Sequence, residues 1–174
     1  MEIINGVQVG EPLTEIINGE EIIASVRFCK HQSVLGNLGY AISEHVDKNA
    51  LGEVFCVPLD VIFDEGINRL QPDFSFIKKE NTSIIQDWIR GVPDVVGEVI
   101  SKGSFKKDVS VKKKIYEKYK VPEYWVVIPD LSMIEVYTLE GDGYEVFSYA
   151  EVEGTVKSKV IEGFEIDIKD VFEE

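Results

Sequence analysis

Two acidic residues stand in strand-like runs and could together hold a divalent metal ion. In residues 94–101, alternation places Glu98 on one strand face among aliphatic side chains. Because a carboxylate in such surroundings is costly unless it is paired, protonated or bound to a metal, Glu98 is a candidate functional residue. Asp73 is the second residue of another strand-like run, residues 72–77. Carboxylates on neighbouring strands can supply oxygen ligands to one Mg²⁺, with water filling the other positions.

A lysine on a helix could join the two acids. Apolar residues in 107–120 recur at helical spacing, and Lys112 falls at the edge of the apolar arc, whereas Lys113 and Lys114 point away from it. Asp108, one turn earlier, is close enough to orient or neutralise Lys112. The structural alternative is that the stem of Lys112 runs along apolar surface with its charge in water, and helical geometry leaves both interpretations open.

The elements that must position these residues are strands and two helices. Asn18-Gly19, between the short runs 15–17 and 20–23, predicts an N-terminal β-hairpin. Apolar spacing of three and four predicts a helix over residues 31–48, and the second helix, 107–120, must end before Pro122. Because two helices are too few for a doubly wound parallel sheet, we expect an α/β (α+β) fold with a mixed sheet flanked by helices. The predicted strands are 54–63, 72–77, 92–101, 123–128, 134–139 and 144–149.

Composition indicates one soluble globular domain over residues 1–174, with 44% hydrophobic and 29% charged residues. No apolar run approaches the ~18 residues that cross a membrane, and the first residues lack the pattern of a signal peptide. Cys29 and Cys56 have no CxxC partner, which predicts reduced thiols in the core rather than a disulfide. We therefore expect a cytoplasmic protein with no membrane partner.

Charge is unevenly distributed along the chain. The formal net charge of −14 argues against nucleic acid, because phosphate binding rests on Lys and Arg. The segment from Lys102 to Lys120, however, contains eight lysines and two acidic residues, which gives this basic segment a charge of +6. An acidic protein can hold a polyanion at one basic patch, although a solvated helix face explains the same lysines.

Motifs of other enzyme classes are absent from the sequence. His31 and His45 form no HExxH zinc motif. The chain also lacks a GxxxxGK[ST] phosphate loop and a GxSxG nucleophile elbow.

Several stretches resemble a known family. Residues 71–77 look like that family's strand with a Pro-Asp pair, and residues 93–101 are similar to its Glu-bearing strand. Asp108-x-x-x-Lys112-x-x-x-Tyr116, followed by Val-Pro-Glu-Tyr-Trp at 121–125, closely matches its helix and next strand. Upstream segments are also similar, so the likeness covers nearly the whole chain. The family is the Uma-type group of restriction-endonuclease-like proteins, in the PD-(D/E)XK nuclease superfamily.

This resemblance implies a restriction-endonuclease-like fold, a Mg²⁺ or Mn²⁺ cofactor and an endonuclease that hydrolyses phosphodiester bonds. By the same likeness, Asp73 and Glu98 are the metal-binding acids. The superfamily lysine usually follows the second acid by two residues, where this chain has Ile100, and Lys112 takes its place. Lys112 would then orient or polarise the attacking water and offset charge in the transition state.

Two further residues are expected near the site. Glu15 would complete it, with His31 nearby; the alternatives are that Glu15 is an exposed strand acid and that His31 is only an N-terminal residue of its helix. Two departures from the family pattern, Gly97 in place of a branched residue and a loop at 101–105 without the usual proline, bear on substrate fit more than on metal binding.

The expected partner is nucleic acid, DNA in the first place, bound at the basic segment. A homodimer would present two sites to a duplex. Two alternatives stay open: a catalytically silent binding module that keeps the nuclease fold, and hydrolysis of another phosphate ester.

Overall fold

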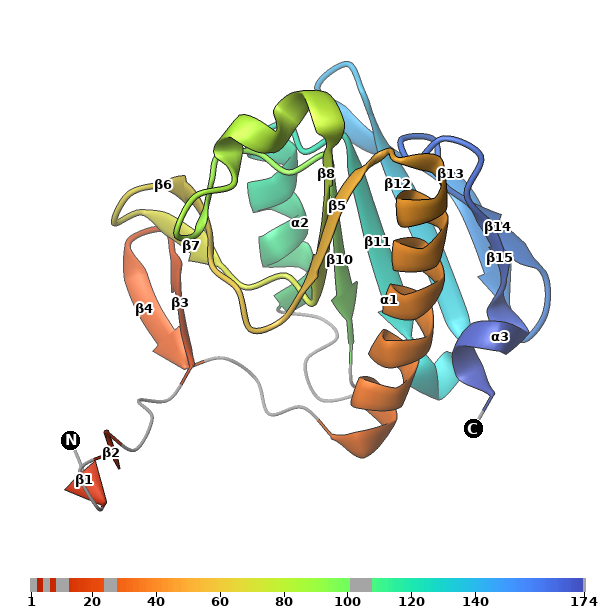
Figure 1. Cartoon of the computed structure of the whole chain (residues 1–174), viewed down its shortest axis with the longest axis horizontal. Helices are drawn as coiled ribbons and strands as arrows, with labels where there is room; N and C mark the ends of the chain where they lie inside the picture. Colours follow the sequence, from red (N-terminus) through yellow and green to blue (C-terminus); the bar gives the residue numbers. More distant parts are fainter. Residues whose placement is uncertain (1–2, 5–6, 9–12, 24–27, 101–107, 174) are drawn as a thin grey trace.

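A six-stranded mixed sheet forms the centre of the molecule (Figure 1). The computed structural model describes residues 3–4, 7–8, 13–23, 28–100 and 108–173. The strand order is β13-β12-β11-β10-β8-β5, in which β10 and β11 pair in parallel and the other neighbours are antiparallel. The strands of this sheet are β5 (Gly52–Cys56), β8 (Phe74–Lys78), β10 (Val95–Val99), β11 (Glu123–Ile128), β12 (Met133–Glu140) and β13 (Gly143–Glu151).

Helix α1 (Cys29–Asn49) covers one face of this sheet, as Figure 1 shows. Its buried side chains recur at the predicted spacing and pack in one core with Phe74, Val95 and Trp125. The same core takes in the C-terminal elements β14 (Thr155–Lys157), β15 (Glu165–Asp167) and α3 (Ile168–Phe172).

Helix α2 (Asp108–Lys118) covers the opposite face (Figure 1). Ile115 and Tyr116 pack there against Val96 and Tyr124 in a second core. Odd and even residues of β10 therefore serve different cores, Val95 and Val99 under α1 and Val96 under α2. This alternation decides which helix can reach Glu98.

A second, five-stranded sheet carries the N-terminal hairpin, in the order β4-β3-β7-β6-β9. The predicted hairpin is confirmed, because β3 and β4 pair around Asn18 and Gly19, which have φ values of 52° and 83°. Strand β3 also pairs with β7 through Ile16 and Arg69. The elements of this sheet are β3 (Thr14–Ile17), β4 (Glu20–Ile23), β6 (Val61–Asp64), β7 (Asn68–Leu70) and β9 (Ile89–Arg90).

The remaining elements are short, namely β1 (Ile3–Ile4), β2 (Val7–Gln8) and the 3₁₀ turns η1 (Lys79–Ile84) and η2 (Pro129–Leu131).

The fold class is as predicted, but two local expectations were wrong. The strand expected over 54–63 is two strands in different sheets, β5 and β6, separated by a segment with Pro58, which has no N–H for a ladder. Cys29 and Cys56 are free thiols as expected, yet both are exposed rather than in the core. Cys29 opens α1 ahead of its buried positions, and Cys56 ends the edge strand β5.

Helices that are both long and apolar enough to cross a lipid bilayer do not occur in the described ranges.

Candidate metal-dependent active site

Glu98 lies buried on the face of β10 that α2 covers, with only 8% of its surface exposed. Two donors reach it from α2. Lys112 Nζ lies 3.1 Å from Oε1 and 3.2 Å from Oε2, and the Tyr116 hydroxyl donates to Oε1 at 2.6 Å. Lys112 and Tyr116 are four residues apart, so one helix face carries both. The buried carboxylate is thus paired, as its apolar surroundings require.

Lys112 bridges two carboxylates that are far apart in the sequence. Its ammonium also donates to Glu15 Oε1 at 2.8 Å, and its side chain is only 12% exposed. The inward direction predicted from helical geometry is therefore correct, and the alternative with its charge in water is wrong.

Glu15 belongs to β3 in the N-terminal hairpin and is 4% exposed. Its Oε1 accepts a second hydrogen bond from the backbone N–H of Gln71, at 2.7 Å. Pairing of β3 with β7 places it there. The alternative that Glu15 is an exposed strand acid is wrong.

Asp73 lies immediately before β8, one residue beyond the pairing of Phe74 with Gly97. Its Oδ2 accepts the backbone N–H of Val99 at 2.8 Å and lies 3.1 Å from His31 Nε2. His31 is in the first turn of α1 and is 8% exposed. Asp73 therefore sits at the end of β10, where α1 begins.

Charge and burial act together on these groups. Burial raises the pKa of Glu98 to about 7, with Asp73 and Glu15 adding to the rise and Lys112 opposing it. Burial alone would lower the pKa of Lys112, but Glu98 and Glu15 outweigh it and the pKa is raised. Lys112 is therefore protonated at neutral pH. Burial raises the pKa of Tyr116 well above its usual value, so its hydroxyl remains a donor.

The five predicted site residues thus form two connected groups, His31 with Asp73 and Glu15 with Lys112 and Glu98. Asp73 influences the pKa of Glu98, which links the groups electrostatically. With this geometry in hand, comparison with known proteins gives one decisive match: the model of the Uma2 family, described as "Putative restriction endonuclease", matches residues 9–169. The chain belongs to the Uma2 family.

A solved structure supports the fold that this Uma2 chain adopts. The crystal structure described as a "putative nuclease belonging to DUF820" from Anabaena variabilis ATCC 29413 has a TM-score of 0.77 and 22% sequence identity to it. The match covers 95% of this chain and 93% of that chain, and at this identity it shows a shared fold. A search of curated proteins finds no match.

The Uma2 site has the right chemistry for a hydrated divalent ion. The ammonium of Lys112 contacts two of the three carboxylates, Glu98 and Glu15, and Asp73 acts electrostatically on Glu98, so carboxylates outnumber the ammonium. Oxygen ligands are those that Mg²⁺ and Mn²⁺ take, and Mg²⁺ usually keeps several waters. In the described part of the chain, no group of three or more His, Cys, Asp or Glu is arranged as a ligand cage. A divalent ion bound here would take Asp73 and Glu98 as its protein ligands and water for the other positions.

Sequence reasoning missed two contributors to the site. Tyr116 was noted only as part of the helix motif, although its spacing from Lys112 was a usable signal. The backbone N–H of Val99 carries no sequence signal at all. The side chain of Asp108, the expected neighbour of Lys112, lies outside the described residues, and the described partners of Lys112 are Glu15 and Glu98.

Gly97 has a structural reason that the family comparison did not supply. A Cβ on Gly97 would lie 1.9 Å from Cε1 of Phe74, so the ring occupies the space of a side chain. The unusual glycine therefore accommodates Phe74, next to Asp73, and the loop at 101–105 lies outside the described residues.

Part of the described portion of the basic segment is engaged by neighbouring side chains. Lys112 is buried in the site, Lys113 Nζ lies 3.6 Å from the centre of the Tyr137 ring, and Lys120 pairs with Asp142 at 2.6 Å. Lys114 and Lys118 are exposed. The other three lysines, at 102, 106 and 107, lie outside the described residues.

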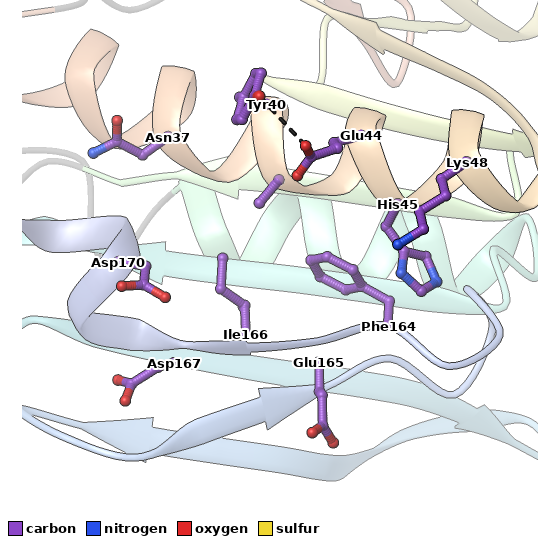
Figure 2. Close-up of a pocket in the computed structure, with 11 residues that line it drawn as sticks. Asn37, Tyr40, Glu44, His45, Lys48, Phe164, Glu165, Ile166, Asp167 and Asp170 are labelled. Carbon is purple, nitrogen blue, oxygen red and sulfur yellow. Dashed lines mark hydrogen bonds between the residues drawn. The ribbon is translucent and has the colours of Figure 1, made fainter.

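A separate hollow of about 600 Å³ lies between α1 and β15 (Figure 2). Tyr40, His45 and Phe164 line it together with four carboxylates. None of the candidate site residues lines this hollow. It is therefore separate from the candidate active site.

Proposed function

We propose that this protein is a metal-dependent nuclease that hydrolyses phosphodiester bonds of nucleic acid, and that its substrate is DNA. The observation that carries the proposal is the cluster of Asp73, Glu98 and Lys112 in a member of the Uma2 family. Buried acids of this kind, with a strongly raised carboxyl pKa beside a lysine, are typical of functional sites.

Asp73 and Glu98 would hold one Mg²⁺ or Mn²⁺. When bound, the ion offsets phosphate charge and lowers the pKa of a coordinated water. The His31 ring restrains Asp73 by its contact with Oδ2. Orientation of a ligand by such outer contacts is common in metal sites.

Lys112 would act on the substrate. An ammonium has three donors, and Lys112 directs them to Glu15 Oε1 and to the two oxygens of Glu98, so one N–H would turn from Glu98 to reach the attacking water or a phosphate oxygen. Glu15 fixes the ammonium in place, so the positive charge is already positioned where negative charge develops in the transition state. The exposed Lys114 and Lys118 on the same helix would contact the DNA backbone, and a homodimer would bring two sites to a duplex.

Cleavage of plasmid and single-stranded DNA with Mg²⁺ or Mn²⁺ tests the proposal. We expect activity in the wild type and a loss of at least about 100-fold in Glu98→Gln and Lys112→Ala. Matched controls are Glu53→Gln on β5 and Lys157→Ala on β14, both at exposed positions, which should retain activity. Cleavage that persists in the two site variants would reveal a contaminating nuclease and refute the proposal.

A second candidate is a silent module that keeps the nuclease fold and binds without turnover. Both carboxylate oxygens of Glu98 already contact Lys112, which favours this candidate. The net charge of −14, which repels nucleic acid, also favours it. Calorimetry with Mg²⁺ and Ca²⁺ separates the two, because absence of binding at millimolar metal would favour the silent module.

A further inference from the structure

Tyr116 makes a short hydrogen bond that the three-residue site does not require. Its hydroxyl donates to Glu98 Oε1 at 2.6 Å, and its side chain is fully buried. Lys112 is already within 3.1 Å of the same oxygen. Pairing of the charge alone therefore leaves the phenol unexplained.

The consequence is an asymmetric carboxylate. Oε1 accepts from both Tyr116 and Lys112, whereas the one contact of Oε2 with a described residue is to Lys112, at 3.2 Å. Two donors on one oxygen fix the rotation of the carboxylate and leave the other oxygen with spare lone pairs. We propose that Tyr116 is a positioning residue that holds Oε1 of Glu98 and presents Oε2 to the metal ion. This inference rests on the proposed function, because it assumes that Glu98 is a metal ligand.

The neighbouring Tyr124 provides a matched control. Its ring centre lies 5.2 Å from that of Tyr116, and both side chains are fully buried in the core under α2. The Tyr124 hydroxyl, however, is buried with no hydrogen-bond partner among the described residues. Removing one hydroxyl from each ring therefore changes almost the same volume and surroundings, and only Tyr116→Phe removes a contact with Glu98.

Mn²⁺ binding in the absence of DNA tests the proposal. Calorimetry would compare the wild type with Tyr116→Phe, Tyr124→Phe and Glu98→Gln, and thermal unfolding of each variant would be recorded. We expect Tyr116→Phe to raise the Kd for Mn²⁺ by about 10- to 100-fold. Tyr124→Phe should leave it unchanged, and Glu98→Gln should abolish binding. In cleavage assays, the Mn²⁺ concentration for half-maximal rate should rise in Tyr116→Phe while kcat at saturating Mn²⁺ changes little.

The outcomes separate this inference from the proposed function. Wild-type affinity in Tyr116→Phe would overturn the inference and leave the metal site intact. Equal loss of affinity in the two phenylalanine variants would also overturn it, because packing rather than the hydrogen bond would be responsible. A Tyr116→Phe variant that unfolds while Tyr124→Phe folds would assign the hydroxyl to stability and contradict the positioning role. Failure of the wild type to bind Mn²⁺ would refute the proposed function itself.

Discussion

Replacing Lys112 by Met should destabilise the protein strongly, apart from any effect on catalysis. The change keeps much of the apolar stem and leaves Glu98 and Glu15 buried without their shared cation. Breaking a buried ion pair by removing one partner costs about 3–5 kcal/mol, a large part of the 5–15 kcal/mol that stabilises a typical domain. Urea unfolding at pH 8 would measure the loss.

The loss should depend on pH with a defined sign. The folded-state pKa of Glu98 is raised from 4.5 to about 7, so the folded protein binds this proton more tightly than the unfolded chain does. The resulting contribution to the free energy of unfolding is complete below about pH 4.5 and is lost as pH rises through 7. Removing Lys112 raises the pKa of Glu98 further, because Lys112 lowers it more than the other lowering group, Tyr116. The deficit of Lys112→Met relative to the wild type should therefore grow as pH rises above about 7 and shrink near pH 5.5.

Two controls make this test specific. Lys114→Met on the same helix changes an exposed residue and should cost no more than about 0.5 kcal/mol. Adding Glu98→Gln to Lys112→Met should recover part of the loss, since one uncompensated carboxylate is removed. A deficit below about 1 kcal/mol with no pH dependence would mean that the charges are solvated, and the reasoning from burial would fail.

Three other predictions follow from the same structure. Mn²⁺ affinity measured by calorimetry should increase as pH rises through about 7, because a proton on Glu98 competes with the ion. An affinity that stays constant between pH 6 and 8 would contradict the role of Glu98 as a metal ligand. Gly97→Ala should lower the free energy of unfolding by about 1–3 kcal/mol, because the new methyl group clashes with Phe74. Gly36→Ala, at an open helical position, should raise the free energy of unfolding by about 0.5–1 kcal/mol. Denaturant titration measures both, and a change of the same sign in the two variants would argue against the clash. His31→Ala should weaken Mn²⁺ binding by about 10-fold, because Asp73 loses the contact that restrains it. The ring of His45 contacts the Glu162 carbonyl instead, so His45→Ala should leave Mn²⁺ affinity unchanged. Unchanged affinity in His31→Ala would show that His31 has no role in the site.

Local patterns predicted the directions of the key side chains. Strand alternation placed Glu98 on an inward face, and helical spacing turned Lys112 toward the packed side of α2, where both are found. The Asn-Gly turn predicted the hairpin that carries Glu15. Each of these patterns is set by residues within one or two turns or strands, which sequence reasoning can read.

Contacts between distant elements could not be read in the same way. Glu15 and Lys112 are 97 positions apart and meet because β3 pairs with β7, a pairing that no local spacing specifies. Strand patterns suggested that Asp73 and Glu98 could share one metal ion, and the family resemblance then assigned both as its ligands. Gly97 could be explained only when Phe74 was seen across the strand pair, since cross-strand packing is not visible along one strand.

The central claim is that Asp73 and Glu98 share one divalent ion beside Lys112. Anomalous diffraction from crystals soaked in Mn²⁺ tests it most directly. The account predicts one peak within about 2.3 Å of an oxygen from each carboxylate, with waters completing the coordination. A peak bound elsewhere, or no peak at this cluster at millimolar Mn²⁺, would contradict the claim.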